Sequence, residues 1–135
     1  ACDMLPETVG RLAAHERIDA IKEACGDPER VGQLRSETPD EFVILSGEDA
    51  QTLRMMELGA TGTISVTANV LPRLMAEFCA AFLDGDEAAA RALDARLQPI
   101  HDVLFIETSP HPAKWALHEM CSVQNGIRLP LIELS

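Results

Sequence analysis

The stretch that decides the fold is IDAIKEACGDPER, residues 18–30. Its apolar positions predict a strand, Ile18–Lys22, that enters a protein core. A tight loop follows, and Asp27 and Pro28 are typical of the first turn of a helix. There an aspartate accepts hydrogen bonds from free backbone N–H groups, and proline needs no hydrogen-bond acceptor. The order is therefore strand, loop, helix, with Lys22 at the carboxyl end of the strand.

The same unit recurs twice further along the chain. Phe42–Ser46 is a continuous apolar run, which is typical of parallel strands buried on both faces, and a third strand is predicted over Thr61–Thr67. Further helices are predicted at residues 5–15, 50–58, 70–83, 87–104 and 112–120. Strands that alternate with helices indicate an α/β fold with a parallel sheet and right-handed crossovers.

Composition and charge exclude several function classes. The net charge of −11 argues against nucleic-acid binding, which needs a basic surface. No apolar run is long enough to span a membrane, and we find no secretory signal, so we expect a cytoplasmic protein with no membrane partner. The four cysteines show no CxxC spacing, which favours reduced thiols over disulfides in that compartment. The four histidines are not spaced as a ligand cluster, so we expect no metal.

Lys22 is the candidate nucleophile, and it is one of only two lysines. A lysine at the end of a buried strand is desolvated, and desolvation favours the neutral amine, which forms a Schiff base with a carbonyl substrate. The alternative is a structural lysine whose stem packs and whose ammonium reaches water, and position alone favours that alternative. Cys25 is a weaker candidate, because no histidine lies near it in the sequence.

Several segments spread along the chain together carry a resemblance to a known family. IKEACGD, residues 21–27, resembles the lysine motif of the dihydrodipicolinate synthase family. The members of that family are class I aldolase-like lyases of lysine and diaminopimelate biosynthesis. Residues 2–9 resemble the segment before the sixth strand of that family's barrel. LSGEDA, residues 45–50, and ISVTANV, residues 64–70, resemble the ends of its seventh and eighth strands. Residues 106–117 and 128–131 resemble its C-terminal helical region.

The resemblance implies a fold and a site. The fold would be the C-terminal part of a (β/α)8 TIM barrel. Residues 1–69 would form its sixth to eighth βα units, and residues 70–135 the closing helix and C-terminal helices of the same domain. Lys22 would form the Schiff base with pyruvate, and the resulting enamine would attack aspartate semialdehyde without cofactor or metal. Gly47 and Ile64 would line the pyruvate pocket, Ile64 through its backbone carbonyl.

The resemblance also implies an assembly and leaves alternatives open. The intact enzyme would be a homotetramer, with Pro28, Glu29 and Leu58 at its weaker interface. For Leu58, ordinary core packing is the open alternative. The isolated chain would be inactive, because the family's proton relay lies in the missing first half. A related pyruvate-dependent aldolase, of the sialic-acid lyase or sugar-acid aldolase type, would keep the lysine but differ over residues 23–27, which favour the synthase. A third possibility is a non-catalytic fragment, either truncated or an assembly partner.

Overall fold

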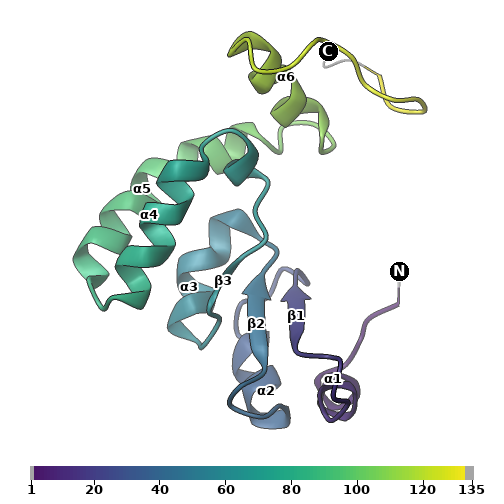
Figure 1. Ribbon diagram of the computed structural model, residues 1–135, viewed down its shortest axis with the longest axis vertical. Helices are drawn as coiled ribbons and strands as arrows, with labels where there is room; N and C mark the ends of the chain where they lie inside the picture. Colours follow the sequence, from purple (N-terminus) through teal and green to yellow (C-terminus); the bar gives the residue numbers. More distant parts are fainter. Residues whose placement is uncertain (1, 133–135) are drawn as a thin grey trace. The chain divides into compact units, whose positions relative to one another are not determined.

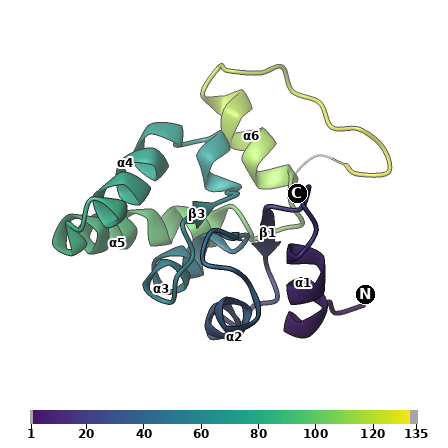
Figure 2. The ribbon, with the colours of Figure 1, turned by 60° about the horizontal axis from the view of Figure 1, so that its bottom comes forward.

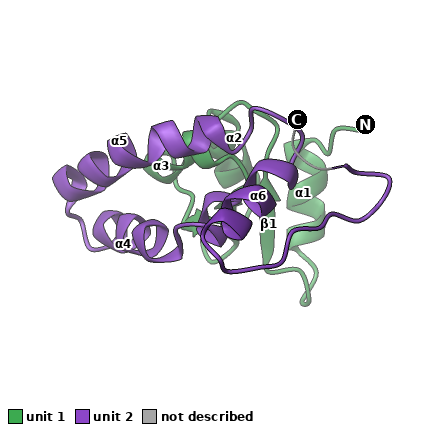
Figure 3. Cartoon of the chain, turned by 90° about the horizontal axis from the view of Figure 1, so that it is seen from above, with its two compact units in different colours: residues 1–64 green, residues 65–135 purple. Residues whose placement is uncertain are grey.

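A computed structural model describes residues 2–132 of the chain. The chain divides into two compact units, residues 1–64 and 65–135, which are coloured separately in Figure 3. The three residues implicated by the sequence, Lys22, Gly47 and Ile64, all belong to the first unit. We describe each unit by itself.

The first unit is built on a parallel sheet, as the sequence predicts. Its elements in chain order are α1 (Pro6–Ala13), β1 (Ala20–Glu23), α2 (Arg30–Glu37), β2 (Val43–Ser46), the 3₁₀ turn η1 (Asp49–Gln51), α3 (Thr52–Glu57) and β3 (Gly62–Thr63). The strands lie in the order β1-β2-β3, all parallel (Figure 1). The helix between each pair of strands is the connection that parallel neighbours require.

The helices of this unit lie along one side of the sheet, as Figure 2 shows for α1, α2 and α3. Side chains from these helices and from that face of the sheet make the core. Its buried apolar members are Val9, Val31, Leu34, Phe42, Ile44, Met55, Met56 and Ala60. Burial of this apolar surface is the main favourable term that holds the unit together.

The expectation that the strands are buried on both faces was wrong for this chain. In β2, Ile44 and Ser46 are fully buried, whereas Val43 and Leu45 are only half-buried. Lys22, which we expected to be buried, is exposed. The physical reason is that the helices of the unit cover one face only, as Figure 2 shows. Side chains alternate along a strand, so Lys22 points away from the face on which its neighbour Glu23 is buried, and its strand β1 is an edge strand of the sheet.

The third strand is shorter than the sequence predicts. Only Gly62–Thr63 pairs as a strand, and the 3₁₀ turn η2 (Thr67–Asn69) occupies the end of the predicted Thr61–Thr67 run. The Ile64 N–H still donates to the Ser46 carbonyl oxygen, 2.8 Å away. After it the Ser65 hydroxyl oxygen accepts from the Ala68 N–H at 2.9 Å, a side-chain contact that turns the backbone out of the ladder.

The second unit is helical, as predicted. It contains η2, α4 (Pro72–Leu83), α5 (Glu87–Val103) and α6 (His111–Glu119). The helix α4 ends ahead of Gly85, which has a φ of +82°, and Asp86 caps α5 by accepting from the Ala89 N–H at 3.0 Å. The α4 and α5 side chains form a core of Met75, Phe78, Ala90 and Leu97.

A buried polar contact joins η2 to α5. The hydroxyl oxygen Oγ1 of Thr67 lies 2.7 Å from Nδ1 of His101, and the two residues are 0% and 2% exposed. Across residues 2–132, none of the helices is both long enough and apolar enough to cross a membrane.

Candidate functional site

The three residues implicated by the sequence lie at the same end of the sheet. Lys22 is near the carboxyl end of β1, Gly47 directly follows β2, and Ile64 directly follows β3. Lys22 pairs in register with Leu45, two residues before Gly47. In parallel α/β sheets the carboxyl ends of the strands are where ligands bind.

The structure brings Lys22 and Gly47 into contact. A Cβ built on Gly47 would lie 2.7 Å from Cε and 3.1 Å from Cγ of Lys22, so the lysine stem runs across the space that a side chain would fill. The Gly47 N–H donates to the Glu23 carbonyl oxygen at 2.7 Å, which ties the two strand ends together. The exposed Lys22 side chain therefore lies on the face of β1 opposite to the buried Glu23.

Ile64 is tied to the same strand ends through its backbone. Its N–H bonds to Ser46, the residue before Gly47, and its side chain is 48% exposed. At this end of the sheet, Lys22 contacts Gly47 directly, and Ile64 is bonded to β2 through the main chain.

A hydroxyl cluster beneath the site was not predicted from the sequence. Ser46 and Thr52 are both fully buried, and the Thr52 hydroxyl donates to Ser46 Oγ at 3.2 Å. The Thr63 hydroxyl donates to the Ser46 carbonyl oxygen at 3.1 Å, and the Glu48 N–H donates to Ser46 Oγ at 3.1 Å. The cluster fixes the turn that carries Gly47. The sequence signal for this cluster was Ser46, a polar residue that ends an apolar run just before Gly47.

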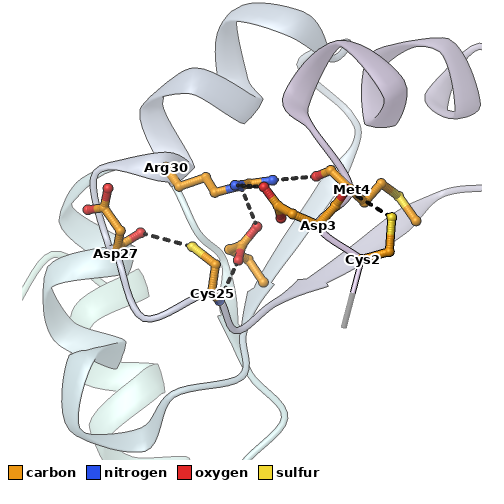
Figure 4. Close-up of polar contacts among 7 residues, drawn as sticks. Cys2, Asp3, Met4, Cys25, Asp27 and Arg30 are labelled. Carbon is orange, nitrogen blue, oxygen red and sulfur yellow. Dashed lines mark hydrogen bonds and ion pairs between the residues drawn. The ribbon is translucent and has the colours of Figure 1, made fainter.

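A charged cluster behind Lys22 was also missed by the sequence reasoning. Figure 4 shows Arg30 with Asp3 and Met4, and the Arg30 guanidinium also pairs with Glu23. The hydrogen bond to Asp3, reinforced by the negative charges of Asp3 and Glu23, raises the pKa of Arg30. The arginine is therefore a fixed positive charge. One of its ion-pair partners, Glu23, directly follows the candidate nucleophile Lys22 in the sequence.

Cys25 has little nucleophilic character in this environment. Partial burial is the largest cause and raises the pKa of its thiol, and a backbone hydrogen bond with Asp27 opposes that rise only in part. A raised pKa means less thiolate at neutral pH, and the thiolate is the reactive form. Within residues 2–132, no group of three or more His, Cys, Asp or Glu side chains is placed to hold a metal ion.

A hollow of about 530 Å³ runs along the free edge of β1. It is mostly apolar, and α1, β1 and the residue before β2 line it through side chains that include Val9, Leu12, Ile21, Lys22 and Phe42. The unpaired edge and the apolar hollow together leave β1 able to accept another strand.

All 135 residues match the sequence model described as the Dihydrodipicolinate synthetase family. The chain belongs to that family. A curated relative from Pseudomonas aeruginosa, named 4-hydroxy-tetrahydrodipicolinate synthase, is 53% identical over 135 residues, which is all of this chain and 46% of the relative. A relative of the same name from Methylococcus capsulatus is 53% identical over 134 residues, or 99% of this chain and 46% of the relative. The chain thus spans about half the length of the curated family members it matches.

Solved structures of the family superpose closely. The 4-hydroxy-tetrahydrodipicolinate synthase from Methylacidiphilum fumariolicum matches with a TM-score of 0.94 at 41% identity, covering 98% of this chain and 45% of that one. The chloride-inhibited dihydrodipicolinate synthase from Acinetobacter baumannii, solved in complex with pyruvate, matches with a TM-score of 0.93 at 42% identity, covering 98% and 46%. These matches confirm the family expected from the lysine motif.

Proposed function

We propose that this chain is the part of a dihydrodipicolinate synthase that carries the Schiff-base lysine, and that Lys22 is that lysine. The single observation that carries the proposal is the placement of Lys22. Its amine is exposed at the carboxyl end of a parallel strand, and its stem is held against Gly47. The relatives' shared name and the pyruvate bound in the Acinetobacter baumannii enzyme support pyruvate as the substrate.

The proposed reaction begins between the amine of Lys22 and the ketone group of pyruvate. Lys22 Nζ attacks the ketone carbon of pyruvate, a C–N bond forms, and the ketone oxygen leaves as water. The resulting iminium withdraws electrons, so the pyruvate methyl group loses a proton and an enamine forms. The former methyl carbon then attacks the aldehyde carbon of aspartate semialdehyde and forms the new C–C bond. Lysine biosynthesis is the pathway that such a lyase serves.

Gly47 and Ile64 have supporting roles in this proposal. Gly47 leaves space for the lysine stem and the bound pyruvate, because it has no side chain at the point of closest approach. Ile64 offers its backbone carbonyl to the substrate from the end of β3. No metal or cofactor takes part in these steps.

The fold proposal concerns the free edge of β1. We assign β1, β2 and β3 to the sixth, seventh and eighth strands of a (β/α)8 barrel, with the remaining strands supplied by the rest of the protein. The face of the sheet without helices, which carries Lys22, would then point to the barrel interior. We place the intact enzyme in the cytoplasm as a homotetramer.

Reductive trapping tests the proposed nucleophile. The full-length protein that contains this chain is incubated with pyruvate and borohydride, digested, and analysed by mass spectrometry. We expect one adduct, on Lys22, and none in Lys22→Arg, because a guanidinium stays protonated and does not form an imine. Lys114→Arg is the matched control, since Lys114 is the other lysine, and it keeps the adduct. An adduct on Lys114, or none in the wild type, refutes the proposal.

The second substrate is tested separately. Without borohydride, turnover of pyruvate with aspartate semialdehyde supports the synthase, and turnover with a sialic acid or a sugar-acid substrate instead assigns the protein to a related aldolase.

A further inference from the structure

Glu23 anchors the carboxyl end of β1 on the face of the strand opposite to Lys22. Successive side chains of a strand point to opposite faces, so Glu23, which directly follows Lys22, points to the helix-covered face. There it is only 5% exposed. A carboxylate that is removed from water needs hydrogen-bond or ion-pair partners. The partners of the Glu23 carboxylate are the Cys25 N–H in the loop after β1 and Arg30 in α2.

The backbone after Lys22 is fixed by Glu23. One carboxylate oxygen, Oε1, accepts from the Cys25 N–H at 2.7 Å. The Glu23 carbonyl oxygen accepts from the Gly47 N–H, also at 2.7 Å. The loop that leaves β1 and the turn that leaves β2 are therefore both bonded to the residue adjacent to Lys22.

Arg30, at the start of α2, holds the other side of Glu23. Its Nε lies 3.3 Å from Glu23 Oε2, and the contact is an ion pair without hydrogen-bond geometry. Its Nη1 donates to Asp3 Oδ2 at 2.9 Å, and its Nη2 donates to the Met4 carbonyl oxygen (Figure 4). One planar guanidinium thus connects α2, the end of β1 and the segment before α1, as its fork of donors allows.

We infer that Glu23 and Arg30 form a clamp that positions Lys22 for attack on the substrate carbonyl, an inference that rests on the function proposed above. Neither residue touches the reacting atoms, so both are positioning residues. Burial separates this pair from ordinary surface ion pairs, because the two side chains are only 7% and 13% exposed. A buried pair holds its geometry, whereas an exposed pair exchanges readily with water.

The test separates positioning from simple stabilisation. If the pair only stabilises the fold, variants reduce the amount of folded protein but each folded subunit forms the imine at the normal rate. If the pair positions Lys22, folded subunits form the imine slowly. The readout is therefore the single-turnover rate of borohydride-trapped pyruvate adduct per folded subunit of the full-length protein, with folding monitored by circular dichroism.

Three variants carry the test. Removing Arg30 alone leaves the buried Glu23 carboxylate without its ion-pair partner, which endangers folding, so the double variant Glu23→Gln/Arg30→Met removes both charges together. We expect it to lower the trapping rate at saturating pyruvate by about tenfold or more, with less than about a threefold change in half-saturating pyruvate, as misplaced reacting groups do. Glu23→Gln alone shows a similar loss. Arg30→Lys keeps the charge without the fork and gives an intermediate rate.

The matched control is the exposed pair on α5. Glu87 and Arg91 lie 3.8 Å apart, and both are more than half exposed. The same two changes there, Glu87→Gln/Arg91→Met, leave the trapping rate unchanged.

The outcomes are distinguishable. A wild type without an adduct on Lys22 overturns the proposed function and the clamp together. A wild type with that adduct, and a folded double variant that traps pyruvate at the wild-type rate, overturns the clamp alone. A slow double variant beside an unchanged control supports both.

Discussion

Gly47 and Lys22 are so close that a Cβ on Gly47 would lie 2.7 Å from Lys22 Cε. The same Cβ would lie 2.7 Å from the Cβ of Ala24, on the other side of the space. Carbon atoms in contact normally stay about 3.5–4.0 Å apart. The path of the lysine stem therefore depends on the missing side chain at position 47.

Gly47→Ala is expected to displace Lys22. The lysine stem can rotate away, but Ala24 can relieve its contact only if the loop after β1 moves. We expect a loss of about 1–3 kcal/mol in the free energy of unfolding from overpacking. We also expect the trapping rate with pyruvate to fall by about tenfold or more. Stopped reactions with borohydride on the full-length protein measure the rate, and circular dichroism shows that the fold persists.

Gly62→Ala is the control for that change. A Cβ on Gly62 would meet Leu45 Cδ2 at 3.4 Å, which is an ordinary contact with the end of a flexible side chain. We expect its trapping rate to stay within about twofold of the wild type, since no strain reaches Lys22. Equal losses in the two alanine variants would contradict the argument from close packing.

The βα order was predictable because local signals agree with the global fold. The run Phe42–Ser46 matches β2, and the helix predicted at residues 87–104 matches α5 within one residue. Ends were harder to predict. β3 stops at Thr63 because Ser65 and Thr67 bond to backbone and side-chain partners that an apolar pattern does not encode.

The site was predictable only in part. The role of Lys22 stays a prediction: its place at a strand end suggested a Schiff-base nucleophile, and the family motif around it added pyruvate as the expected substrate. The exposure of Lys22 was not predicted, because burial of a strand face depends on which other elements of the fold pack against that face. The contacts of Glu23 with Arg30 join residues seven positions apart in different elements, and such pairing leaves no periodic signal in the sequence.

The buried contact between Thr67 and His101 supports the second unit. Thr67→Val keeps the shape of the side chain but removes the hydroxyl, leaving a buried imidazole nitrogen with one partner fewer. We expect the free energy of unfolding to fall by about 1–3 kcal/mol, which is the usual effect of depriving a buried polar atom of its partner. Thermal unfolding of the full-length protein measures it. Thr61→Val, at an exposed threonine, should stay within about 0.5 kcal/mol of the wild type, and an equal loss there would contradict the assignment.

The 135-residue chain alone is expected to lack turnover. Among the described residues, one edge of β1 has no neighbouring strand and lies beside an apolar hollow of about 530 Å³. The family resemblance implies that the proton relay lies outside these 135 residues. General acid–base assistance is typically worth about 10² to 10⁴ in rate. We therefore expect no measurable condensation of pyruvate with aspartate semialdehyde in a coupled assay of the purified chain. Turnover near that of the full-length protein would show that these 135 residues suffice.

Leu58 is the residue that tests the proposed tetramer. It caps the carboxyl end of α3, where its N–H donates to the Arg54 and Met55 carbonyl oxygens, and Gly59 follows with a φ of +113°. Helix ends face water, so a half-buried leucine at this point has apolar surface left for a partner. Leu58→Asp in the full-length protein is expected to dissociate the tetramer into dimers with the fold intact, because a carboxylate is poorly tolerated in an apolar contact. Sedimentation measures the oligomeric state, and circular dichroism measures the fold.

Leu34→Asp, at a fully buried position on α2, is the reference for loss of the fold. Unfolding of Leu58→Asp to the same extent would place Leu58 in the core, and an unchanged tetramer would remove it from the interface.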